Sequence, residues 1–177
     1  MYTQEKAVWY AMRATFRKEL DAQNILDKEK IRSFIPMCYT VTLRNQRKVR
    51  ELVPAVRNLI FVYATLSDIK KVKTKVGYLQ YIVNSRSKEK IIVPDEQMKR
   101  FIGVASTYDQ KLIYLKPEEV NLKQGTPVRI IGGSFDGVEG VFMKVKGARS
   151  RRVVVLIHGV TAVATAEIEP DLVQVIP

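Results

Sequence analysis

One short segment limits the folds open to this chain more than any other, the run from Asn58 to Ala64 with the sequence Asn-Leu-Ile-Phe-Val-Tyr-Ala. Nearly all of its side chains are β-branched, aromatic or aliphatic, and such residues favour strands. A run of this kind is typical of a central strand, which has neighbours on both sides. We therefore predict a sheet built around residues 58–64.

The segments around this run indicate an α+β fold. Strand-like patterns occupy residues 8–14, 31–36, 39–43, 49–53, 81–83 and 90–93. Helical patterns occupy a segment that ends near Lys30, then residues 69–76, and a segment that begins at Asp95. In the last, Met98, Phe101 and Ala105 recur at the spacing of one helix face. This order predicts helices packed on a mostly antiparallel sheet.

The chain divides into two predicted domains. Residues 1–107 hold the sheet and helices, and residues 108–121 have no sustained period and are predicted to be a linker. Residues 122–177 contain short strands with glycine turns at 127–131, 137–145, 152–157 and 172–176. Short strands at this spacing predict a small β-barrel.

Composition excludes several classes of site. The 177 residues include one cysteine, Cys38, and one histidine, His158. A disulfide framework, a zinc finger and the usual histidine-centred catalytic sets all need more members than these. No apolar run approaches the roughly 18 residues of a membrane helix. We expect a monomeric cytoplasmic protein, not an enzyme, with no cofactor, no metal site and no membrane contact.

Charge is concentrated in the first predicted domain. The formal net charge is +12, from 30 basic and 18 acidic residues, and residues 1–107 hold 21 of the basic and 10 of the acidic ones. A basic excess of this kind is typical of proteins that bind nucleic acid or a nucleoprotein. A merely solvated, soluble surface is the alternative interpretation.

The most specific motif is the glycine-rich segment from Gly125 to Val141. It lacks Gly-Lys-Ser/Thr and does not open a helix, so it is not a phosphate loop. Its spacing resembles the KOW motif of transcription elongation factors and some ribosomal proteins. The first predicted domain contains Trp9-Tyr10 opening a strand, Lys18-Glu19 near a helix start, Phe34-Ile35-Pro36, a basic hairpin and the apolar residues 59–62. Together these features are similar to the NusG N-terminal domain.

Within the NusG family the chain resembles specialised paralogues. The general factor usually has a Phe-Pro-Gly-Tyr type sequence, and here Arg57, Asn58 and Leu59 stand at its Pro, Gly and Tyr positions. The pattern is similar to the UpxY antiterminators of capsular polysaccharide operons. The resemblance implies a non-enzymatic factor that binds the clamp of RNA polymerase and suppresses pausing or termination. A KOW-type RNA-binding structural protein of the ribosome is the alternative.

The resemblance also implies site residues. Leu59 and Phe61 match the positions that line the clamp-binding pocket in related factors, and Tyr63, on the same strand face, and Trp9 complete the predicted polymerase-binding set. A KOW domain recruits a ribosomal protein or the termination factor Rho, and the positions assigned to that partner are Phe135, Ile157, His158 and Val160. His158 stands where the general factor has Phe and Val160 where it has Arg, so we expect this partner contact to be weakened or redirected.

Strand parity supports the polymerase assignment. Side chains alternate along a strand, so Leu59, Phe61 and Tyr63 share one face while Ile60 and Val62 share the other. The smaller pair suits a packed side, which predicts that the larger three form an exposed patch. The alternative is that Phe61 is an ordinary core residue, and Trp9 fits a core or an interface equally well.

Basic side chains outside this patch have two interpretations each. We expect the hairpin cluster, Arg44, Arg47, Lys48, Arg50 and Arg57, to contact phosphates of the nucleic acid in the elongation complex; an ordinary solvated hairpin is the alternative. Lys70, Lys71, Lys73 and Lys75 are interpreted as the solvated face of a helix. Arg149, Arg151 and Arg152 fit an RNA contact and a plain loop equally well.

Overall fold

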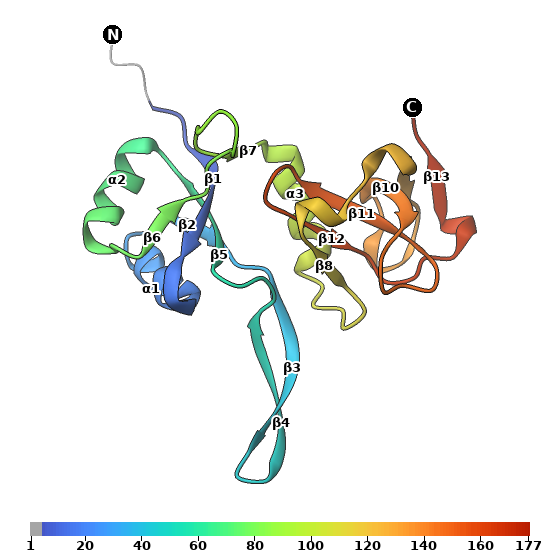
Figure 1. The fold of residues 1–177 in the computed structure, drawn as a ribbon, viewed down its shortest axis with the longest axis horizontal. Helices are drawn as coiled ribbons and strands as arrows, with labels where there is room; N and C mark the ends of the chain where they lie inside the picture. Colours follow the sequence, from blue (N-terminus) through green and yellow to red (C-terminus); the bar gives the residue numbers. More distant parts are fainter. Residues whose placement is uncertain (1–4) are drawn as a thin grey trace. The chain divides into compact units, whose positions relative to one another are not determined.

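The computed structural model describes residues 5–177. The chain forms two compact units (Figure 1). The first contains the chain up to Pro36 together with Pro54–Asp95, and the second contains Met37–Val53 and Glu96–Pro177. These units differ from the predicted division at residues 107 and 122, and whether the predicted pieces fold separately stays a prediction.

The first unit is built on an antiparallel sheet with the strand order β2-β5-β1-β6, and β7 also pairs with β1. The strands are β1 (Val8–Ala14), β2 (Arg32–Phe34), β5 (Leu59–Ala64), β6 (Leu79–Tyr81) and β7 (Ile92–Val93). The register places Trp9 opposite Tyr63 and Ala11 opposite Phe61. The prediction that residues 58–64 form a central strand is confirmed, since β5 lies between β1 and β2.

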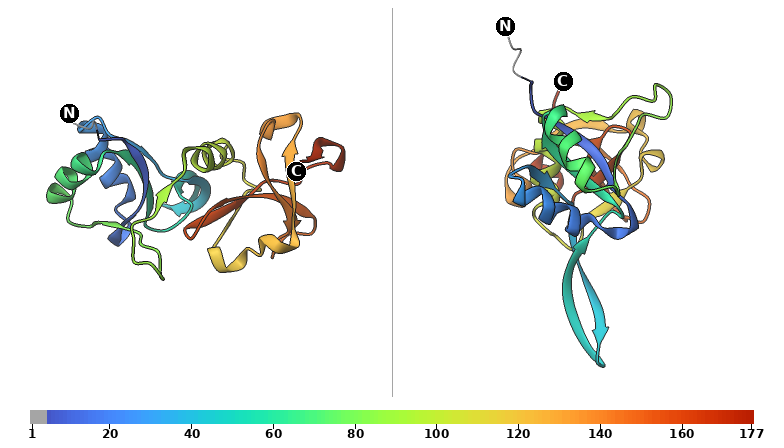
Figure 2. Two further views of the ribbon diagram at one scale, coloured as in Figure 1. Left: turned by 90° about the horizontal axis from the view of Figure 1, so that it is seen from above. Right: turned by 90° about the vertical axis from the view of Figure 1, so that its left-hand side faces the viewer.

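Two helices complete the first unit, and Figure 2 shows them on the same side of its sheet. Helix α1 (Glu19–Lys28) buries Ala22 and Leu26, and α2 (Leu66–Lys75) buries Ile69 and Val72. Each pair is spaced three or four residues apart, as one face of a helix requires. Thr65 caps α2, since its hydroxyl accepts a hydrogen bond from the backbone N–H of Asp68 at 3.1 Å.

Asn58 ties the start of β5 to the start of α1. Its φ of 63° is left-handed, a conformation that asparagine and glycine tolerate better than other residues. The buried Glu19 carboxylate accepts a hydrogen bond from the Asn58 backbone N–H, and the Asn58 amide oxygen accepts one from the Arg17 N–H at 2.9 Å. The left-handed φ is therefore compatible with asparagine at the position where the resemblance predicts glycine.

The second unit contains a two-stranded hairpin, one α-helix and a six-stranded antiparallel sheet. The hairpin pairs β3 (Met37–Arg44) with β4 (Arg47–Pro54), and α3 spans Asp95–Ala105 as its spacing predicted. The large sheet has the order β13-β9-β10-β11-β12-β8. Its strands are β8 (Ile113–Leu115), β9 (Thr126–Ile130), β10 (Glu139–Lys144), β11 (Arg151–Ile157), β12 (Thr161–Ala164) and β13 (Val173–Val175).

The predicted closed barrel is not found among residues 5–177, because the six strands form an open order with β13 and β8 at its two ends. The segment predicted to be a linker contributes β8, which pairs with β12. Leu115 is buried there with Met143, Val154 and Ala162. These apolar contacts explain why a segment without periodicity is nevertheless part of the sheet.

Close packing of two strands fixes the residue type at position 140. A Cβ added to Gly140 on β10 would lie 2.6 Å from the carbonyl oxygen of Val154 on β11. That separation is below any normal carbon–oxygen contact, so a side chain here would force the two strands apart. This glycine of the KOW-like segment therefore serves strand packing.

No helix within residues 5–177 is both long and apolar enough to cross a membrane.

Candidate functional site

The predicted polymerase-binding residues are mostly buried. Leu59 is 3% exposed and Phe61 is 0% exposed, so the prediction that they form an exposed patch is wrong. Ile60 and Val62, which point to the opposite face, are also fully buried. Strand β5 is thus covered on both faces, with Tyr63 half-buried near its end. A continuous apolar run without alternation is typical of such strands, and here it outweighs the parity argument.

Trp9 and Tyr63 form an aromatic pair at one end of this sheet. Their ring centroids are 5.3 Å apart, and the Arg32 guanidinium lies 5.1 Å from the Trp9 ring. Trp9 is only 4% exposed, which favours the core interpretation for it, whereas Tyr63 is half-buried. Of the four predicted positions, Tyr63 is therefore the one whose side chain is accessible without rearrangement.

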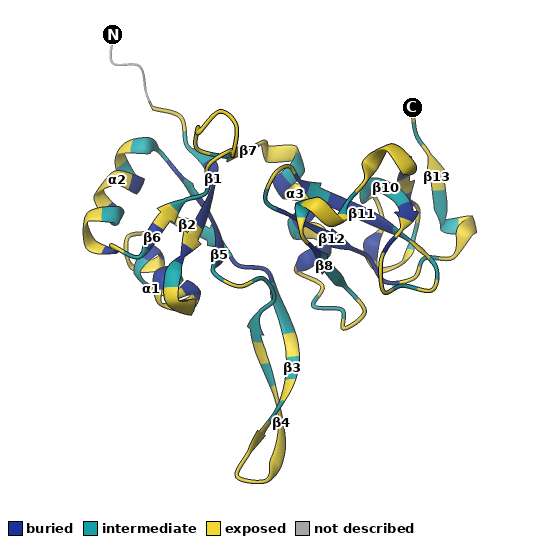
Figure 3. Ribbon diagram, viewed as in Figure 1, coloured by how far each residue is buried: buried dark blue, intermediate teal, exposed yellow. Residues whose placement is uncertain are grey.

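The hairpin places most of the predicted phosphate-binding cations on its two strands. Arg44, Arg47, Lys48 and Arg50 are all exposed, and Figure 3 colours the turn end of the hairpin as exposed. Arg44 is ion-paired with Glu51 at 2.7 Å, and Arg50 stacks 4.0 Å over the Tyr39 ring. Arg57, the fifth member of the hairpin cluster, is exposed but belongs to the first unit.

The hairpin also exposes apolar side chains. Tyr39, Val41 and Leu43 alternate along β3, and they are 40%, 63% and 74% exposed. The turn at Asn45-Gln46 has positive φ at both residues, the geometry of a two-residue hairpin loop. This turn fixes the register of the hairpin.

The predicted partner-binding residues of the second unit differ in exposure. Phe135 and Ile157 are buried, at 5% and 0%, so both are core residues. His158 is exposed in the turn after β11, and Val160 is half-buried. A partner can reach only these last two without displacing the core.

The loop arginines separate into two kinds. Arg149 and Arg151 are exposed, whereas Arg152 is half-buried. Arg152 donates hydrogen bonds to the carbonyl oxygens of Lys111 at 3.1 Å and Thr165 at 2.8 Å. Its role is therefore to hold the backbone of the second unit.

Sequence reasoning missed a charge cluster in the second unit. Glu139 accepts hydrogen bonds from Arg129 at 2.6 Å and from Arg100 at 2.7 Å. The hydrogen bond from Arg129, and then the positive charges of both arginines, hold the pKa of the Glu139 carboxyl below its usual range. Arg100 lies 39 residues from Glu139, so no local spacing signalled this contact.

Burial raises the pKa of the Cys38 thiol. Within residues 5–177 no three His, Cys, Asp or Glu side chains are grouped to hold a metal ion.

The fold is that of an α+β protein, and the predicted binding positions that remain accessible include Tyr63 and the hairpin cations. A family model described as "Transcription termination factor nusG" matches residues 7–102, more than half of the chain, and the chain belongs to the NusG family. It is similar to the structure described as "Domain interaction in Thermotoga maritima NusG", with 20% identity, a TM-score of 0.49, and coverage of 97% of this chain and 98% of that one. No protein with a curated description matches the chain.

Proposed function

We propose that this chain is an elongation and antitermination factor that binds the clamp region of RNA polymerase and suppresses pausing or termination. NusG-family proteins are non-enzymatic transcription elongation factors that bind RNA polymerase. The observation that carries the proposal is the family match over residues 7–102, the same region that holds most of the basic excess.

The proposed polymerase contact lies on the first unit, at the Trp9–Tyr63 end of the sheet. Tyr63 contacts the clamp directly, while Leu59 and Phe61 contribute to binding only if they become uncovered, since both are buried here. The hairpin cations contact nucleic acid in the elongation complex. Arg47 and Lys48 are the members of the hairpin cluster best suited to this role, because they are exposed and directly follow the turn, whereas Arg44 is paired with Glu51.

The finer parts of the proposal concern specialisation. The resemblance of residues 53–59 to UpxY antiterminators supports action at capsular polysaccharide operons. His158 and Val160 form the proposed recruitment surface of a KOW domain, with a ribosomal protein or Rho as its partner. Their departure from the general factor's residues predicts that the partner contact is weaker or differently directed.

Affinity purification of the tagged full-length chain from its native cell, followed by single-round transcription with the purified polymerase, tests the proposal. We expect polymerase subunits in the purified fraction and shorter pauses when the chain is added. Recovery of ribosomal subunits with no polymerase would favour the ribosomal alternative. Polymerase binding with no change in pausing or termination would contradict the antitermination part alone.

A further inference from the structure

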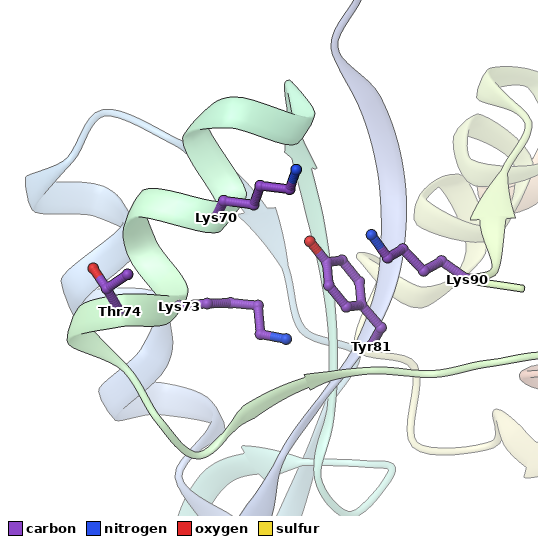
Figure 4. A pocket seen from close by; sticks show the side chains of 5 residues that line it. All are labelled: Lys70, Lys73, Thr74, Tyr81 and Lys90. Carbon is purple, nitrogen blue, oxygen red and sulfur yellow. The ribbon is translucent and has the colours of Figure 1, made fainter.

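A pocket in the first unit lies outside every surface considered so far. It has a volume of about 340 Å³ and is lined by Lys70, Lys73, Thr74, Tyr81 and Lys90, which we call the lysine pocket. Figure 4 shows the Lys73 and Lys90 side chains approaching the Tyr81 ring from opposite sides, with the Lys70 side chain extending from α2 toward the hydroxyl end of that ring. Two of the lysines come from α2, the tyrosine from β6, and Lys90 from the segment before β7.

The positive charges in this pocket are not neutralised. Within residues 5–177, Lys70, Lys73 and Lys90 form no ion pair, whereas the neighbouring Lys71 pairs with Asp68 at 3.8 Å. The ammonium groups of Lys73 and Lys90 each lie 4.3 Å from the centroid of the Tyr81 ring, so they are separated by at most twice that distance. Like charges held this close repel, and an anion bound beside them lowers that repulsion.

The backbone holds these residues in place. Lys70 and Lys73 are three residues apart on α2 and therefore share one face of the helix. Tyr81 stands opposite Met12 of the neighbouring strand, and its ring packs edge-on against Tyr10 at 5.6 Å. Lys90 is fixed by its β-bridge with Val83. The arrangement is thus built by regular structure on both sides of the pocket.

The Tyr81 hydroxyl supplies an independent indication of a ligand. Its oxygen is buried and has no hydrogen-bond partner among the described residues. Burial, and to a smaller extent Tyr10, raises the pKa of Tyr81, so the phenol keeps its proton at neutral pH and remains a donor. Buried polar groups normally have partners, and a missing one commonly marks a site for a bound group. Thr74 is not such a donor, because its hydroxyl already donates to the Lys71 carbonyl oxygen at 2.6 Å.

We infer that the lysine pocket is a binding site for a phosphate group. Three ammonium groups and one phenolic O–H are all donors, and a phosphate offers several acceptor oxygens and negative charge to match them. Ammonium groups lie against the Tyr81 ring, so the pocket favours phosphate contacts over base stacking. The phosphate comes from a nucleic-acid strand or from a free phosphate compound, and the inference does not depend on polymerase binding.

Two probes separate these sources in the full-length chain. Inorganic pyrophosphate is titrated into the labelled protein while amide spectra are recorded, and a fluorescein-labelled oligothymidylate is titrated by anisotropy. We expect pyrophosphate to shift the amides of Thr74, Tyr81 and Lys90, or the oligothymidylate to bind in a way that needs these lysines. Replacing two charges, in Lys73→Gln with Lys90→Gln, lowers affinity for the bound probe by about tenfold or more. Tyr81→Phe lowers it by about threefold.

Lys71→Gln is the matched control, because it removes the same charge from the same helix outside the pocket. It leaves the affinity within about twofold, since exposed single charges contribute little. If only oligothymidylate binding depends on the pocket, the ligand is a nucleic-acid phosphodiester. If only pyrophosphate shifts the pocket amides, the ligand is a free phosphate compound. Equal losses in the control and pocket variants, or no response to either probe, overturn the inference. Should the double variant melt below the wild type, Lys70→Gln and Tyr81→Phe decide between these outcomes.

Discussion

Strand β5 and hairpin strand β3 lie close together in the sequence but have opposite surroundings. Leu59 and Phe61 on β5 are 3% and 0% exposed, whereas Val41 and Leu43 on β3 are 63% and 74% exposed. The sequence patterns predict otherwise. The alternation of β3 is typical of a half-buried strand, and side-chain parity predicts one exposed face on β5. Alternation reports burial only where a second layer covers the sheet, and β3 pairs with β4 alone.

The largest effect is expected from Phe61→Ala. Because the ring is fully buried, its removal leaves a cavity and lowers the free energy of unfolding by about 3–5 kcal/mol. Chemical denaturation of the full-length chain measures this loss. A variant that keeps wild-type stability and loses only polymerase binding would contradict the burial of this side chain.

Charge reversal on the hairpin should change binding more than folding. With Arg47, Lys48 and Arg50 all replaced by Glu, we expect duplex DNA to bind about ten- to a hundredfold more weakly, and the salt dependence to fall by about two to three counterions. The melting temperature should change little, since the side chains are exposed. Anisotropy at several salt concentrations measures both quantities. A wild-type salt slope would exclude the phosphate contact. The control reverses three exposed lysines elsewhere, Lys28, Lys116 and Lys123.

A pair of leucines isolates the effect of burial from that of residue type. Leu43→Ala should change the free energy of unfolding by less than about 0.5 kcal/mol, because the side chain is 74% exposed. Leu59→Ala removes the same atoms from a buried site and should cost about 2–5 kcal/mol. Equal losses in the two variants would mean that the hairpin face is covered in solution.

The smallest effect concerns charge pairing in the second unit. Arg129 and Arg100 lower the pKa of Glu139, so the ionised carboxylate is favoured in the folded state. Its stabilising contribution is present above the ordinary glutamate pKa of about 4.3 and is lost as the pH falls through the lowered value. The stability difference between wild type and Glu139→Gln should therefore be constant near neutral pH and disappear in acid. Thermal melts across this range measure it, and a difference that grows in acid would show the opposite sign.

Local patterns predicted the elements well and the environments poorly. The strands at 8–14 and 58–64 and the helix from Asp95 are all present, because side-chain period depends on neighbours in sequence. Strand β8 and the burial of Phe61 depend on residues far along the chain. The same holds for the lysine pocket. Lys70 and Lys73 were visible as a helix face, but Tyr81 and Lys90 join them only through strand pairing.

The topology of the first sheet sets a delay during synthesis. Val8 on β1 pairs with Ala64 on β5, and Trp9 with Val93 on β7. A ribosome adding about 5–20 residues per second needs roughly 3–10 s to extend the chain from β1 to β5. A hairpin such as β3–β4 closes in about 1–10 μs once its residues have emerged. Strand β1 therefore remains unpaired for seconds, with its apolar side chains uncovered, while the hairpin that follows it has already reached its final register.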